Sequence, residues 1–134
     1  MTARGNDPQP HLPFAVILRL SDVALAKTEL EATLGATVYR YERERAGPLH
    51  QAHIDVLVDD GAAHAKADLW AEIVAGVTRI GPAIGKLKQK HAVGRASLDL
   101  AVSFPEALAL VSYALPSHVA KIVGQHGIDI EFSV

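Results

Sequence analysis

The sequence predicts an α+β domain, a two-layer ferredoxin-like sandwich with a β-α-β-β-α-β core followed by one further helix and strand. Short β-prone runs and longer stretches with helical periodicity alternate in that order along the 134 residues. Hydrophobic residues make up 49% of the chain, which is enough to build one core although the sequence contains no cysteine. A polar, proline-rich start predicts a flexible arm over residues 1–13, and the remaining residues 14–134 predict a single domain.

The first two elements follow the arm directly. The segment 14–20, FAVILRL, is apolar at both odd and even positions, which favours a central strand buried on both faces. The next segment has amphipathic spacing, with Ser21 or Asp22 as a capping residue and Gly35 as a stop. It predicts a helix over residues 22–34.

The third element mixes tyrosines with charges and is predicted as an edge strand. Strict alternation from Thr37 to Arg45 splits the segment into two faces, and neither face is purely apolar. After a turn at Gly47 and Pro48, alternating apolar residues predict the next strand over residues 51–58. One face of the edge strand is predicted to carry Tyr39, Tyr41, Arg43 and Arg45.

Residues 66–91 show the clearest helical period in the chain. Their apolar residues recur every three or four positions and predict a core helix. Pro82 interrupts the stripe and predicts a kink or two shorter helices. Glycines at 76, 81 and 85 favour close approach of another backbone to this helix, or alternatively mark its kink. The stripe consists of Leu69, Ile73, Val77, Ile80, Ile84 and Leu87.

The C-terminal part adds a strand, a helix and a last strand. Clean alternation from Arg95 to Ser103 predicts a half-exposed strand. Residues 105–115 fit neither period well, and a loop with a short extended piece is favoured there. The segment from Ser117, read as a cap, to Gly127 predicts a short helix. The last strand is predicted to turn inward Ile128, Ile130 and Phe132.

This succession resembles the bacterial family known as domain of unknown function 4279. The resemblance rests on the apolar first strand, the helix ending at Leu34 and Gly35, the long helix interrupted at Pro82, and the glycine that precedes the Ile128–Ile130 segment. It spans about residues 14–134. It implies an α+β domain without established catalytic residues, and a binding role in bacterial toxin and immunity systems.

Composition excludes several functional classes. With 13 basic and 15 acidic residues, the formal charge of -2 gives no general field that attracts nucleic acid. No stretch approaches the roughly 18 apolar residues of a membrane span, and the N-terminus has no secretory signal, so a cytoplasmic protein without a membrane partner is expected. No motif indicates a cofactor.

A histidine-rich region invites a metal hypothesis that strand geometry argues against. His50 and His53 with Asp55 begin a cluster that continues through Asp59, Asp60 and His64. A spacing of three along a strand sends the two histidines to opposite faces, so no metal site is predicted. The serines lie in no Gly-x-Ser-x-Gly context and no phosphate-binding loop is present, so the sequence does not favour an enzyme.

Three functional classes stay open. The first is a protein-binding module, such as an immunity or regulatory protein with a toxin or regulatory target as partner. Tyrosine and arginine anchor interfaces, so its predicted binding residues are Tyr39, Tyr41, Arg43 and Arg45. The second is a small-molecule or metal-dependent domain, either binding or hydrolytic, that uses the region of His50, His53 and Asp55. The third is a structural homo-oligomer, such as a homodimer formed by edge strands or the long helix.

Overall fold

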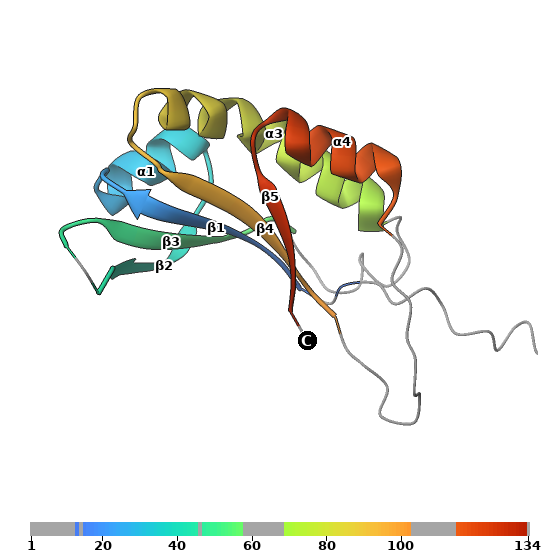
Figure 1. Ribbon diagram of the computed structural model, residues 1–134, viewed down its shortest axis with the longest axis horizontal. Coiled ribbons are helices and arrows are strands. Elements are labelled where there is room, and N and C mark those ends of the chain that lie inside the picture. Colours follow the sequence, from blue (N-terminus) through green and yellow to red (C-terminus); the bar gives the residue numbers. More distant parts are fainter. Residues whose placement is uncertain (1–12, 14, 46, 58–68, 103–114, 134) are drawn as a thin grey trace, which may run out of the picture.

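The structure, a computed structural model, describes residues 13, 15–45, 47–57, 69–102 and 115–133. These residues form an α+β fold in which the described helices cover one face of a five-stranded mixed sheet (Figure 1). The strands are β1 (Ala15–Val23), β2 (Val38–Arg43), β3 (His50–Asp55), β4 (Arg95–Ala101) and β5 (Asp129–Ser133). The helices are α1 (Lys27–Leu34), α3 (Leu69–Gln89) and α4 (Ser117–Gln125). No helix in these ranges is long and apolar enough to cross a membrane.

The strands lie in the order β2-β3-β1-β4-β5. Neighbouring strands pair antiparallel, except that β4 and β5 run parallel. The central position of β1 and the edge position of β2 were both predicted from the sequence, and both are confirmed. The parallel pair has its connection through α4, which packs on the same face of the sheet as α3 (Figure 1).

Register decides which residues build the core. Leu18 lies opposite both Ile54 and Leu98, and all three side chains are buried beneath the helices. Residues one position away point to the other face of the sheet, which we call the open face. The prediction that β1 is buried on both faces is therefore wrong: Arg19 is exposed on the open face, because the described helices cover only one side of the sheet.

The first helix begins later than predicted. Ser21 and Asp22 extend β1 instead of capping a helix, and α1 starts at Lys27 without a side-chain cap. The pairing register shifts between Leu20 and Val23, and Asp22 has a φ of 55°. This bulge inserts an extra residue into β1, and the Asp22 N–H donates to Glu44 Oε2 at 3.0 Å.

The long helix α3 is one continuous element rather than two. Pro82 lies within it and removes one backbone donor, so the carbonyl of Thr78 lacks its usual helical partner. Ile73 before the proline and Ile84 after it are both fully buried. Because the apolar stripe contacts the sheet on both sides of Pro82, packing holds the two halves in one helix.

The C-terminal elements agree with the sequence in kind and differ in detail. Pro116, not Ser117, is the N-cap of α4, and no side-chain hydrogen bond caps this helix. Ile128 is buried as predicted, whereas Phe132 is 49% exposed although it pairs with Leu100 on the inner face. The predictions for the arm over residues 1–13 and for residues 105–115 fall almost entirely outside the described residues.

Candidate functional site

A bulge in β2 divides the predicted binding residues between two faces. The register shifts between Val38 and Arg40, so that Arg40 lies opposite His53 and Tyr41 opposite Ala52. Strict alternation from Thr37 predicted that Tyr39 and Tyr41 share a face, and this is wrong. The extra residue at the bulge turns Tyr39 to the open face, while Tyr41 points to the helix side.

Tyr41 is part of the packed structure. Its hydroxyl donates to the Leu25 carbonyl at 2.5 Å, and its ring stacks on His50 with the ring centroids 4.4 Å apart. The side chain is half-buried against the core. Tyr41 therefore ties β2 to the segment before α1, and truncating it would disturb folding as well as any surface.

Tyr39 is the exposed aromatic of this strand. Its side chain is 54% exposed, and its ring meets His53 edge to face with centroids 6.1 Å apart. Partial burial, and then the negative charge of Asp55, raise the pKa of Tyr39 above its usual 10.0. The phenol therefore stays protonated at neutral pH and can donate a hydrogen bond to a partner.

The backbone of β2 presents unpaired groups on its outer side. The Glu44 N–H donates to the Leu49 carbonyl at 2.8 Å, so Glu44 points towards the β3 side. Residues two apart in a strand point the same way, which places the peptide groups of Tyr41 and Arg43 on the outer side. Among the described strands, β2 pairs only with β3. At the start of the strand, the Val38 N–H donates to the carboxylate of Glu31 at 2.9 Å.

The two remaining predicted binding residues lie at the far end of this edge. Arg43 closes β2 opposite His50, and Arg45 follows the strand; both are exposed. Within the described ranges, neither guanidinium makes an ion pair, in contrast to Arg40, whose Nε lies 3.0 Å from Glu42 Oε2. Two arginines are thus available to an acidic partner.

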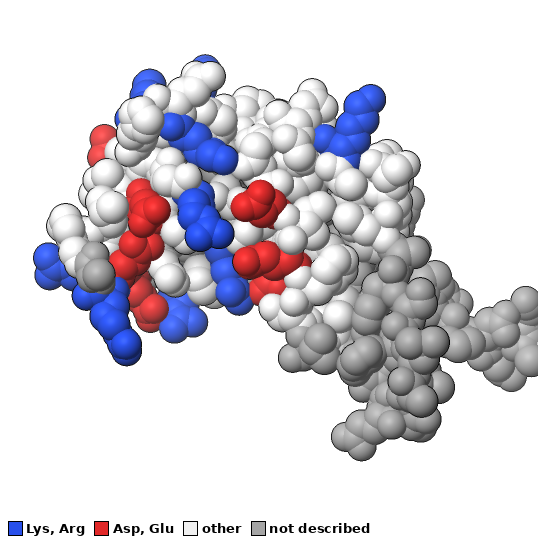
Figure 2. Space-filling view, in the orientation of Figure 1, with Lys and Arg blue, Asp and Glu red and all other residues white. Residues whose placement is uncertain are grey.

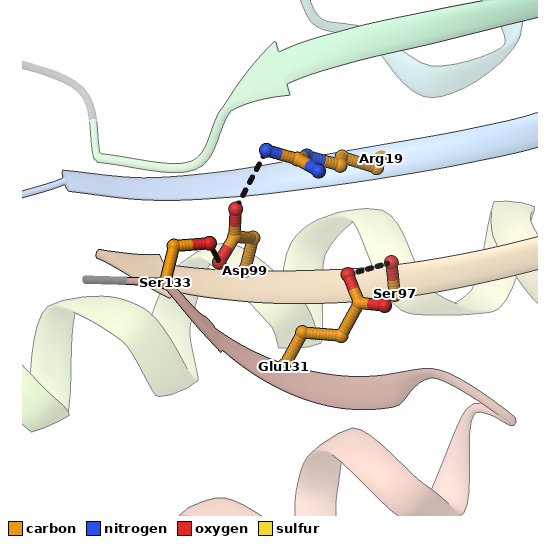
Figure 3. Close-up of polar contacts among 5 residues, drawn as sticks. All are labelled: Arg19, Ser97, Asp99, Glu131 and Ser133. Atoms are coloured by element: carbon orange, nitrogen blue, oxygen red, sulfur yellow. Dashed lines mark hydrogen bonds and ion pairs between the residues drawn. The ribbon is translucent and has the colours of Figure 1, made fainter. Parts of the chain in front are cut away.

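The open face holds a polar network that the sequence alone did not single out. Asp99 is only 2% exposed. Its carboxylate forms an ion pair with Arg19 at 2.7 Å and accepts a hydrogen bond from the Ser133 hydroxyl at 2.7 Å (Figure 3). The Ser97 hydroxyl likewise donates a hydrogen bond to the Glu131 carboxylate at 3.2 Å. Both contacts to Asp99 are diagonal, because its direct partners across the sheet are Ile17 and Glu131.

His53 lies between this network and Tyr39. Its side chain is 9% exposed, and burial, followed by the positive charges of Arg19 and Arg40, lowers the pKa of His53 below its usual 6.5. The imidazole is therefore neutral at neutral pH. His50 faces the other side of the sheet, as the spacing of three predicted.

The described residues contain no group of three or more metal-ligating side chains close enough to hold an ion. His53 and Asp55 share the open face, but His50 does not join them. Asp59, Asp60 and His64 lie outside the described residues. The described members of this histidine and aspartate cluster, His50, His53 and Asp55, therefore do not point to a common site.

Charged side chains of both signs are arranged in neighbouring rows over the strands (Figure 2). The sequence carries a signal for part of this pattern, because the alternation from Arg95 to Ser103 leaves Ser97 and Asp99 on the polar face of a half-exposed strand. The sequence did not indicate the order of the strands in the sheet. Only when β1, β4 and β5 are neighbours do Arg19, Asp99 and Ser133 meet.

Comparison with family models, with curated proteins and with solved structures finds no match to this chain.

Proposed function

We propose that this chain is a protein-binding module that pairs with an extended segment of its partner along the outer side of β2. We call this surface the β2 edge; it consists of the outward peptide groups of Tyr41 and Arg43 and the side chains of Tyr39, Arg43 and Arg45. The observation that carries the proposal is the edge position of β2 beside a half-exposed tyrosine. An unpaired strand edge offers donors and acceptors in the geometry that a further strand needs.

The side chains of the β2 edge favour an acidic partner segment. Arg43 and Arg45 have no ion-pair partner in the described part of the chain, so a carboxylate can bind either without displacing an ion pair within that part. Tyr39 supplies a large ring and a protonated hydroxyl at low cost in conformational entropy. Tyr41 contributes its backbone, while its side chain holds the strand in place.

The family resemblance points to the same class of function. A member of the domain of unknown function 4279 family would be a bacterial binding protein, such as an immunity or regulatory protein acting on a toxin or regulatory target. The β2 edge is the physical site that we propose for this class of function.

We further infer that the first strands and helices follow the split β-α-β plan of ferredoxin-like domains. The order β2-β3-β1-β4, with every neighbouring pair antiparallel and helices on one face, supports this assignment. The parallel strand β5 then extends the plan at the edge opposite β2.

Capture of partners from an extract of the source organism tests the proposal, with the immobilised full chain as bait and mass spectrometry as readout. Tyr39→Ala should weaken capture of the cognate partner about tenfold or more, which corresponds to about 1.4 kcal/mol or more of binding energy. Phe132→Ala is the matched control, because Phe132 is a half-exposed aromatic on the opposite edge strand. Its capture should equal that of the wild type.

A second variant separates backbone pairing from side-chain contact. Proline is tolerated on an edge strand where the N–H points outward, so Arg43→Pro should keep β2 paired to β3 while blocking a further strand. Arg43→Ala removes only the side chain. Capture that survives Arg43→Pro, Tyr39→Ala and Arg43→Ala, with melting temperatures unchanged, would refute the β2 edge as the binding surface. Self-association in analytical ultracentrifugation that Arg43→Pro abolishes would instead assign this edge to a homodimer.

A further inference from the structure

A hollow opens on the open face where β1 ends in its bulge, beside β4 and β5. Its volume is about 180 Å³. Its lining residues come from β3, β1, β4 and β5 and none belongs to the β2 edge, so it is a separate feature from the surface proposed above. The hollow is lined by Arg19, Leu20, Ser21, Gln51, Arg95, Ala96, Ser97, Asp129 and Glu131.

The lining has its basic side chains on β1 and β4 and its acidic side chains on β5. Strand pairing places Arg19, Ser97 and Asp129 in one line across β1, β4 and β5. The basic and acidic residues of this line are therefore two strand spacings apart, about 10 Å between backbones, with only a serine between them. Arg95 lies on β4, diagonal to both Arg19 and Asp129, and Glu131 lies two residues beyond Asp129 on β5.

Much of the hydrogen-bonding capacity of this lining is unused. Arg95 and Asp129 make no ion pair with any residue that the structure describes. Arg19 directs one guanidinium nitrogen to Asp99 and keeps further N–H groups, and Glu131 uses one oxygen for Ser97 (Figure 3). Among the described residues, these arginines therefore keep donors, and Asp129 and Glu131 keep acceptors, that a ligand can use.

Charge and size restrict what this hollow can bind. A phosphate or other bare anion would be attracted by the arginines and repelled by Asp129 and Glu131, and a bare cation would meet the reverse conflict. The volume is below the roughly 300 Å³ at which pockets for drug-sized ligands begin, which favours a small ligand. A molecule with one carboxylate and one ammonium group satisfies both sides at once.

We propose that this hollow binds a small zwitterion, of the class of free amino acids and dipeptides. The carboxylate lies against Arg95 and Arg19, and the ammonium group lies against Asp129 and Glu131. The Ser97 hydroxyl, between the two sides, contacts the middle of the ligand. Each end of the ligand makes charge-assisted hydrogen bonds, which are the stronger kind.

The test is an NMR titration of the ¹⁵N-labelled full chain with glycine and with glycylglycine, each raised to about 50 mM, a range that covers weak binding. Backbone amides of residues 95–97 and 129–131 should shift with at least one of these two probes, and the stronger of the two identifies amino acid or dipeptide as the ligand. N-acetylglycylglycine lacks the ammonium group and glycylglycinamide lacks the carboxylate. Each should bind about tenfold more weakly than glycylglycine.

Two variants assign the two ends of the ligand. Arg95→Gln should bind glycylglycine no more tightly than glycylglycinamide, which lacks the carboxylate. Asp129→Asn should bind glycylglycine no more tightly than N-acetylglycylglycine, which lacks the ammonium group. Both residues are exposed, so both variants should fold. Arg79→Gln, an exposed arginine on α3, is the matched control and should leave the titration unchanged. The proposal is overturned if neither zwitterion shifts these amides, or if the acetylated peptide binds as tightly as glycylglycine.

Discussion

Gly76 lies where the long helix α3 comes closest to the end of β3, and adding a single methyl group there should destabilise the protein. A Cβ at this position would lie 2.6 Å from Val56 Cγ1 and 3.1 Å from the Val56 carbonyl oxygen. Ordinary contacts between carbons are about 3.5 to 4.0 Å, so the methyl group overlaps both the side chain and the backbone. Val56 is held in place because its N–H donates to the Val16 carbonyl at 3.1 Å, and a β-branched side chain has few other rotamers.

The magnitude follows from a comparison with Gly85, which lies in the same helix. No described atom lies within 4 Å of a Cβ added at Gly85, so Gly85→Ala should only gain helix propensity, about 0.8 to 1 kcal/mol of stability. Gly76→Ala gains the same propensity and loses about 1 to 3 kcal/mol to overpacking. The difference between the two variants should therefore be about 1 to 3 kcal/mol, with Gly76→Ala the less stable.

Urea denaturation of both variants, analysed by linear extrapolation, measures this difference directly. Both variants replace glycine by alanine in the same helix, so most effects of the substitution on the unfolded chain cancel in the difference between them. A difference below about 0.5 kcal/mol would show that α3 does not approach the Val56 backbone as described.

Three further predictions concern stability. Ile73→Ala and Ile84→Ala should each cost about 2 to 5 kcal/mol in urea denaturation, because both side chains are fully buried; a near-zero effect at Ile84 would mean that α3 leaves the sheet after its proline. Tyr41→Phe should cost about 0.5 to 1.5 kcal/mol through loss of the hydrogen bond to the Leu25 carbonyl, and an unchanged stability would contradict that contact. The pKa of His53 in the folded protein is below 6.5. As the pH is lowered through 6.5, His53 therefore takes up a proton more readily in the unfolded chain than in the folded protein, and the free energy of unfolding should fall. His53→Gln should reduce this loss between about pH 7.5 and pH 5, and an identical pH dependence in the variant would refute it.

Much of the fold could be predicted from hydrophobic periodicity. The apolar residues of β4 alternate with polar ones and are buried as predicted, because one face of this strand packs against helices and the other does not. The charges around Tyr39 and Tyr41 indicated an edge strand, and β2 is one. Boundaries were less predictable: Ser21 and Asp22 look like helix caps in sequence, yet they continue β1 through a bulge.

The candidate site was predictable only in part. Tyr39, Arg43 and Arg45 are exposed as a binding surface requires, whereas Tyr41 contributes packing and a hydrogen bond. The error arose from one extra residue in β2, which reverses the face of every side chain on one side of it. No local sequence rule marks this bulge, because its position is set by how β2 meets β3.

The sequence by itself determined the kind and order of the described elements, most of the residues that enter the core and the strand that lies at an edge. These properties follow from local periodicity and from the cost of burying charge, both of which can be read along one chain segment. Tertiary structure alone decided that Arg19, Asp99 and Ser133 meet, and that Arg19, Arg95, Asp129 and Glu131 line one hollow. These residues belong to strands far apart in sequence, and their contacts depend on strand order and register, which are set by the packing of the whole sheet against its helices.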